Sequence, residues 1–155
     1  GGVVGSGGGG VGWGWPACMA GRGRVRAGGR ALRRLFVVSD VGEAEARTRS
    51  RAGSQGGIAR VLAAAGEAGL ALRELAATEF EETAHCREVL ATGEAGTVYL
   101  CHPFLVHAEQ AHRGTRPRFL AQPPLLPREP LRLHREDGNY SVVEVATHRA
   151  LGLDG

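Results

Sequence analysis

Glycine is concentrated at the start of this chain, where 13 of the 25 glycines fall within residues 1–30. The same stretch has no periodic apolar face. Such a segment cannot bury enough apolar surface to offset its chain entropy. We therefore expect residues 1–30 to be a Gly-rich, low-complexity and disordered segment, and residues 31–155 to form one folded domain.

The charged residues argue against several classes of partner. The 19 basic residues are all arginine, they are spread along the chain among 16 acidic ones, and only 5% of residues are aromatic, which disfavours nucleic-acid binding. No apolar stretch is long enough to span a bilayer, and residues 1–15 have glycine where a secretory signal has its apolar run. Three widely spaced cysteines disfavour a disulfide framework. These features predict a cytoplasmic protein without a membrane or nucleic-acid partner.

The apolar pattern after residue 31 predicts a mainly β domain. A short apolar run over residues 32–38 is typical of a buried strand, and residues 42–57 are polar and Gly-containing, as in a loop. Further segments of strand length are residues 71–76, 85–91, 97–102 and 117–122.

Two helices are expected within this β domain. Residues 58–68 carry apolar side chains at three- and four-residue spacing, which predicts a short amphipathic helix. Residues 140–151 favour a closing helix, where Ser141 and Glu144 have the spacing of a capping box.

Three histidines at five-residue intervals make residues 101–112 the most informative stretch. In a strand, His107 and Glu109 would share one face, so a metal could take both. A zinc site from Cys101, His102, His107 and His112 ranks lower, because this spacing matches no familiar zinc pattern and adjacent residues of a strand point to opposite faces. For any one of these histidines alone, a surface or hydrogen-bonded core position is the better expectation.

An ordered series of segments in this chain resembles the C-terminal core of the phytanoyl-CoA dioxygenase family. The main match is residues 96–107, followed by Arg118 eleven positions after His107 and then by residues 119–124. Weaker matches at residues 35–41, 51–54, 123–131 and 140–144 extend the resemblance to roughly residues 31–152.

The resemblance implies a double-stranded β-helix, the jelly-roll or cupin-like architecture, and a hydroxylase that uses Fe(II) and 2-oxoglutarate. By resemblance, His107 corresponds to the distal iron ligand, and Arg118 to the residue that pairs with the far carboxylate of 2-oxoglutarate. Arg113 and Arg116 are rival candidates for the second role, but the eleven-residue interval favours Arg118. A surface salt bridge is the alternative for Arg118. The resemblance assigns no catalytic side chain.

The family's remaining two iron ligands have no counterpart in this sequence. They come from an H-x-D motif on an earlier strand, whereas this chain has no H-x-D and no histidine before His85. The H-x-E matches at residues 107–109 and 134–136 lie too late in the chain order to replace it. We therefore expect an incomplete β-helix and a start that is truncated, divergent or mispredicted.

Two functional hypotheses remain. The first is a dioxygenase that acts on a small-molecule substrate, inactive in this chain unless other residues replace the missing ligands. The second is a non-catalytic, cupin-like remnant that binds a small carboxylate or forms homo-oligomers through exposed strand edges.

Overall fold

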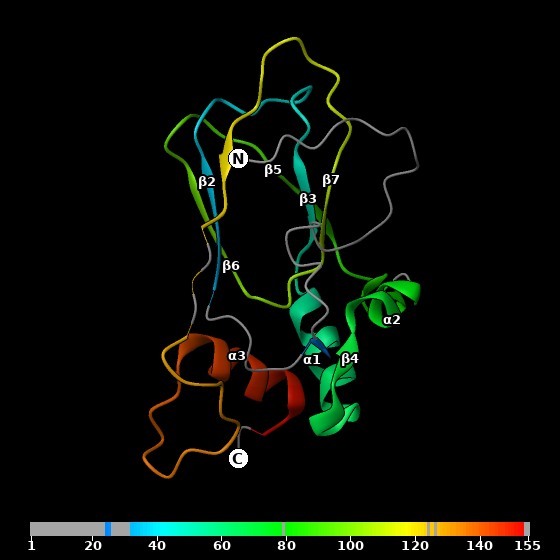
Figure 1. The fold of residues 1–155 in the computed structure, drawn as a ribbon, viewed down its shortest axis with the longest axis vertical. Coiled ribbons are helices and arrows are strands. Elements are labelled where there is room, and N and C mark those ends of the chain that lie inside the picture. The colour runs from blue at the N-terminus through cyan, green and yellow to red at the C-terminus, as the bar shows by residue number, and fades with distance from the viewer. Residues whose placement is uncertain (1–23, 26–31, 79, 124, 126, 154–155) are drawn as a thin grey trace.

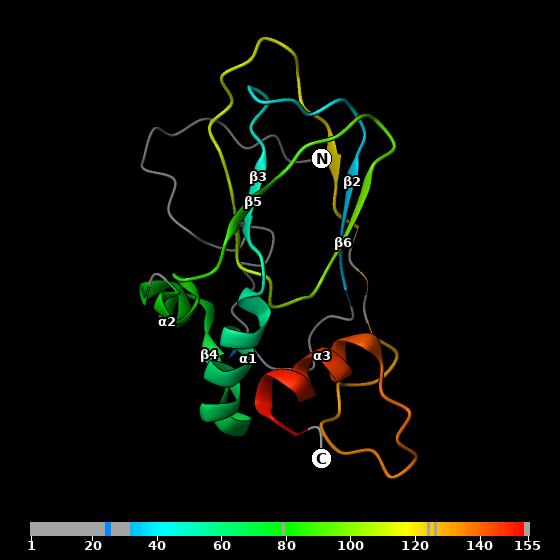
Figure 2. The same cartoon turned by 180° about the vertical axis from the view of Figure 1, so that it is seen from behind.

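Two three-stranded antiparallel sheets lie opposite each other, with helices at one end of the pair (Figures 1 and 2). This computed structural model describes residues 24–25, 32–78, 80–123, 125 and 127–153. The first sheet has the order β6-β2-β8, and its strands are β2 (Arg33–Val37), β6 (Val98–Cys101) and β8 (Leu120–Ala121). The second has the order β5-β3-β7, and its strands are β3 (Thr48–Arg51), β5 (Glu88–Ala91) and β7 (His107–Glu109).

Helices occupy about as many described residues as strands do, so the protein is mixed α/β rather than mainly β. The strands predicted over residues 32–38, 85–91, 97–102 and 117–122 are confirmed, with tighter bounds, as β2, β5, β6 and β8. None of the described helices has the length and apolarity needed to cross a membrane, and the longest, α1, has 11 residues.

Strand β2 is the centre of the first sheet, and its two faces differ in burial. Leu35 and Val37 are buried, whereas on the neighbouring strand β6 Val98 and Leu100 lie on the opposite face and are exposed. This follows from the alternation of side chains along a strand. The sheet therefore has an apolar buried face and an apolar face in solvent.

Strand β3 occupies part of the segment that we expected to be a loop. Its sequence, Thr-Arg-Ser-Arg, has no apolar alternation, yet it is the central strand of the second sheet. Thr48 pairs with Ala91 on one side and with Glu109 on the other. Pairing on both edges gives this strand a stability that its own side chains do not signal.

Helix α1 (Ser54–Ala64) begins four residues before the predicted start at residue 58. Gly53 has a φ of 89°, a left-handed conformation that glycine adopts without strain, and this turn allows the helix to start at Ser54. The buried Ser54 side chain accepts a hydrogen bond from the Val106 backbone N–H at 2.9 Å, which joins the helix to the chain entering β7. The main core cluster of buried residues forms around α1 and consists of Ile58, Ala59, Leu62, Leu75, Phe80, Phe104 and Val106.

The strand predicted over residues 71–76 is wrong, because helix α2 (Leu72–Ala77) lies there. Leucine, alanine, arginine and glutamate are all good helix formers. The Glu74 carboxylate also accepts a hydrogen bond from the Ala71 N–H at 2.6 Å and so satisfies a donor at the start of the helix. Helix propensity and this cap prevail over the short apolar pattern.

Most of the Gly-rich segment lies outside the described residues. Within it, Arg24–Val25 forms strand β1, which pairs with β4 (Leu70–Ala71) just before α2. Two short 3₁₀ helices, η2 (Gly66–Ala68) and η3 (Glu81–Thr83), complete the helical end.

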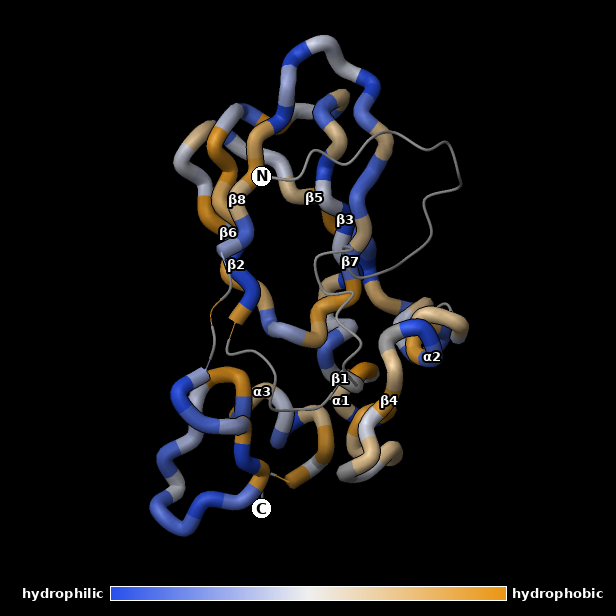
Figure 3. Tube along the Cα trace, in the orientation of Figure 1, coloured by the Kyte–Doolittle hydropathy of each residue, from blue (hydrophilic) through white to orange (hydrophobic). Residues whose placement is uncertain are grey.

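Helix α3 (Val142–Leu151) confirms the predicted closing helix and its capping box. The Ser141 hydroxyl accepts from the Glu144 N–H at 3.3 Å, and the Glu144 carboxylate accepts from the Ser141 N–H at 2.8 Å. The helix packs against α1. The segment that leads into it is mostly hydrophilic (Figure 3).

Two adjacent glycines of α1 provide a test of how closely this helix packs against η3 and α3. A Cβ on Gly57 would lie 3.1 Å from the Glu82 carbonyl oxygen and 3.0 Å from Thr83 Cγ2, whereas a Cβ on Gly56 would meet Ala150 Cβ at an ordinary 3.5 Å. We expect Gly57→Ala to lower the free energy of unfolding by about 1 to 2 kcal/mol, because a backbone carbonyl cannot move aside. Gly56→Ala should raise it by about 0.5 kcal/mol through helix propensity. Urea unfolding of both variants measures the difference. Equal effects would contradict the close contact of Gly57 with η3.

Candidate anion site between the two sheets

His107, the predicted iron ligand, is the first residue of β7 and is buried at 2% exposure. It lies opposite Ser50 of β3, and its Nδ1–H donates to the Leu105 carbonyl at 2.8 Å, so the lone pair of the neutral ring lies on Nε2. Burial, together with the positive charge of Arg33, lowers the pKa of His107 to about 4. The imidazole is therefore neutral at pH 7.

Arg118 lies in the segment that enters β8 and reaches the end of the second sheet. Its side chain is 12% exposed. Nη1 donates to the Ala46 carbonyl, and Nη2 lies 3.9 Å from Glu109 Oε1. The Glu109 side chain is 59% exposed. Burial lowers the pKa of Arg118, which the charge of Glu109 partly offsets. The ion pair is long for a charge-assisted hydrogen bond, so this carboxylate holds the guanidinium only weakly.

The two rival arginines are placed differently. Arg116 is 67% exposed and pairs with the buried Glu45 at 3.3 Å. Arg113 is exposed, and its backbone N–H donates to the Ala44 carbonyl. Of the three candidates, Arg118 is the one with a mostly buried side chain.

Arg33 is a residue of this region that the sequence reasoning missed. It is the first residue of β2, it donates to the Gln122 side-chain oxygen, and its charge also acts on the Cys101 thiol. The sequence clue was the presence of an arginine within residues 32–38, which were predicted to form a buried strand. Its positive charge acts on His107 and makes the surroundings of this histidine, in the space between the two sheets (the intersheet region), unfavourable for a cation.

The described residues do not fit an Fe(II) site. Nowhere in the described ranges do three or more His, Cys, Asp or Glu side chains come together as a metal-binding group. Glu109 shares the face of His107, but it is paired with Arg118. A single imidazole beside a guanidinium does not hold a labile divalent ion.

The zinc hypothesis is also wrong for the described residues, which include all four of its candidate ligands. His102 Nδ1 accepts from the Phe104 N–H at 3.1 Å, and its Nε2 is 3.4 Å from the Val143 carbonyl. His112 Nε2 lies 2.8 Å from the Arg116 carbonyl on an exposed loop. Cys101 is a free thiol whose pKa is raised by burial. Each histidine thus has a separate backbone partner.

The described part of the space between the two sheets therefore has a neutral buried imidazole near Arg33 at one end of β2, and Arg118 near the other end of that strand. Such a combination favours an anion with hydrogen-bonding oxygens over a cation. Comparison with known proteins does not narrow the choice of anion: the chain matches no family model, no curated protein and no solved structure.

Proposed function

We propose that this chain forms part of a double-stranded β-helix of the phytanoyl-CoA dioxygenase type and binds 2-oxoglutarate through Arg118. The observation that carries the proposal is the setting of Arg118, whose mostly buried side chain has a long contact with an exposed carboxylate. A dicarboxylate can displace such a partner, because a planar guanidinium offers it two parallel hydrogen bonds.

The path of the chain supports the proposed architecture. Strands β5, β6, β7 and β8 alternate between the two sheets, and β2 and β3 also lie in different sheets. Alternation of this kind is expected of a two-sheet jelly roll. With three strands in each described sheet, the proposed β-helix is incomplete.

The oxidation implied by the family resemblance is not part of this proposal. Hydroxylation requires an iron centre, and His107 is a single candidate ligand beside the positive charge of Arg33. What the chain's own residues offer is recognition of the co-substrate, because Arg118 would bind its far carboxylate.

Calorimetric titration of the 155-residue chain with 2-oxoglutarate tests the proposal. We expect Arg118→Gln to weaken binding about tenfold or more, because a charge-assisted bidentate contact is lost. Arg116→Gln is the matched control and should leave the affinity unchanged, since Arg116 is exposed and pairs with Glu45. Glu109→Gln should strengthen binding by removing the competing carboxylate. Equal affinities for the wild type and Arg118→Gln would refute the assignment.

A second candidate function, self-association, is favoured by the outer face of the first sheet. Four large apolar side chains are exposed on this face, namely Val38, Val98, Leu100 and Phe119. Among the strands that the structure describes, β6 and β8 are also the edges of this sheet, where backbone groups can pair with another strand. Exposed apolar surface next to open edges is typical of an interface.

Substitution of Leu100, which is 67% exposed, tests this candidate. We expect light scattering to show concentration-dependent dimers for the wild type and monomers for Leu100→Lys, because a charge at the centre of an apolar interface is costly. Leu153→Lys, a matched change after α3, should still dimerise. A wild-type chain that stays monomeric at high concentration would exclude this function.

A further inference from the structure

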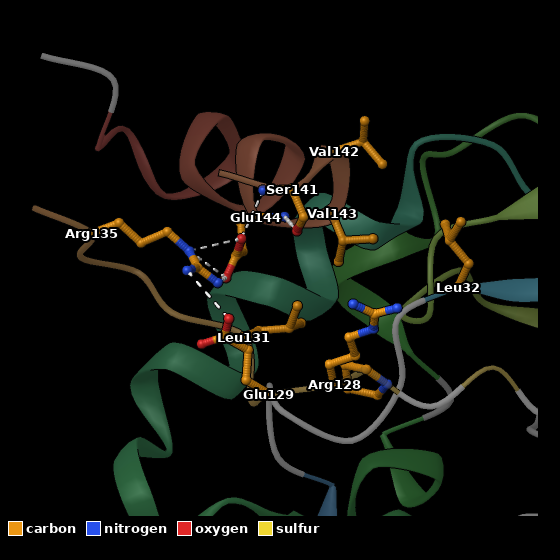
Figure 4. A pocket seen from close by; sticks show the side chains of 10 residues that line it. Leu32, Arg128, Glu129, Leu131, Arg135, Ser141, Val142, Val143 and Glu144 are labelled. Carbon is orange, nitrogen blue, oxygen red and sulfur yellow. Dashed lines mark hydrogen bonds and ion pairs between the residues drawn. The ribbon is translucent and has the colours of Figure 1, made fainter. Parts of the chain in front are cut away.

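A cavity of about 280 Å³ lies beside the start of α3 (Figure 4). It is formed where the proline-rich segment before α3 passes the first turn of that helix and the residue before β2. Its walls comprise Leu32, Pro127, Arg128, Glu129, Leu131, Arg135, Ser141, Val142, Val143 and Glu144. None of these residues belongs to the anion site between the sheets.

Two acidic residues at this cavity already have arginine partners. Glu144 is held by Arg135 at 2.9 Å and by the Arg132 backbone N–H at 2.7 Å. Glu129 lies 3.2 Å from the Arg132 guanidinium and 3.9 Å from that of Arg135. The two carboxylates and these two guanidinium groups therefore neutralise one another.

Arg128 is the remaining charge of the group. In the part of the chain that the structure describes, its side chain makes no hydrogen bond or ion pair, and Figure 4 shows its guanidinium pointing into the space between Val143 and Leu32. The cavity thus has one uncompensated positive charge with five N–H donors.

The rest of the cavity wall is largely apolar. Its apolar residues are Leu32, Pro127, Leu131, Val142 and Val143, and Val142 is 74% exposed. An apolar ligand lying against Val142 would remove this surface from water, which favours binding by about 25 cal/mol per Å² covered. An apolar wall with one cationic group is suited to a ligand that has an apolar body and one negative end.

We propose that this cavity binds a small amphiphilic monocarboxylate. The carboxylate pairs with Arg128, and the hydrocarbon part lies against Leu131, Val142 and Val143. The volume equals that of about nine molecules of liquid water, which limits the ligand to roughly ten non-hydrogen atoms. Medium-chain fatty acids and small aromatic acids have this size and charge.

Octanoate is the probe for the test, and octanol is its neutral counterpart. Titration of the full 155-residue chain, followed by NMR of the Val142 and Val143 methyl groups, should show saturable binding of octanoate and at least about tenfold weaker binding of octanol. Arg128→Gln should weaken octanoate about tenfold and leave octanol unchanged. Arg73→Gln, a matched change at an exposed position of α2 that does not line the cavity, should have little effect.

Two further variants complete the test. One separates the contribution of the apolar wall to affinity from that of the charge, and the other shows whether octanoate binds in this cavity or in the intersheet region. Val142→Ser should weaken octanoate and octanol alike, because it removes apolar wall and not charge. Arg118→Gln should leave octanoate binding unchanged, since that residue lies in the intersheet region. The proposal is overturned if octanoate does not saturate, if octanol binds as tightly, or if Arg73→Gln weakens octanoate as much as Arg128→Gln does.

Discussion

Replacement of Glu144 by Gln is expected to lower the free energy of unfolding by about 3 kcal/mol, the typical cost of breaking a buried ion pair. The Glu144 side chain is 1% exposed and accepts hydrogen bonds from the Arg135 guanidinium and from the backbone N–H groups of Arg132 and Ser141. A glutamine has one carbonyl oxygen in place of two carboxylate oxygens, and its amide places two donors where only donors surround it. Urea denaturation at pH 7 measures the loss.

Glu129→Gln is the control for this change, because Glu129 also contacts Arg135 but is 52% exposed. We expect it to cost no more than about 0.5 kcal/mol. Burial alone would raise the pKa of Glu144, but the hydrogen bonds from Arg135, Arg132 and Ser141 lower it to about 2. The stabilisation is therefore present at neutral pH and is lost as the pH falls from about 4.5 to 2. Equal effects of the two substitutions would contradict this account.

The second large effect is a loss of stability on mild acidification, caused by His107. Its pKa is lowered from 6.5 to about 4 in the folded chain, so the unfolded chain binds the proton more tightly. The free energy of unfolding should therefore fall by about 3 kcal/mol in total as the pH drops from 6.5 to 4. Below pH 4 the contribution of His107 should change little. Urea unfolding at several pH values in this window measures the slope.

His107→Gln should remove most of this slope. Burial also lowers the pKa of His102, so part of the slope should persist in the variant. His112→Gln is the control, because His112 lies on an exposed loop, and it should retain the full slope. A wild-type stability that does not change between pH 6.5 and pH 4 would show that His107 is not buried as described.

The parts of the fold that the sequence predicts are those stabilised by local interactions. The capping box of α3 depends on Ser141 and Glu144, three residues apart, and the structure has both of its hydrogen bonds. Strand β2 was predictable because Leu35 and Val37 belong to a short apolar run. In both cases neighbours in the sequence supply the signal.

The features that the sequence did not predict depend on partners far away in the chain. Strand β3 has a polar sequence and is held by pairing with residues 88–91 and 107–109. For the same reason the charge of Arg33 acting on His107 was not foreseen. Interactions with residues far away in the chain determine the structure at these positions, and the local sequence pattern contains no information about them.

The central position of β2 has a consequence for the synthesis of the chain. Phe36 pairs with Val98, and Val37 with Leu120, so about 60 further residues must be added before the first partner exists and about 80 before the second. At about 5–20 residues per second, the ribosome needs roughly 3 to 12 s to reach Val98. Throughout this interval Leu35, Phe36 and Val37 form an apolar strand without its sheet partners. The nascent chain should therefore be a client for chaperones that shield such segments until β6 has emerged.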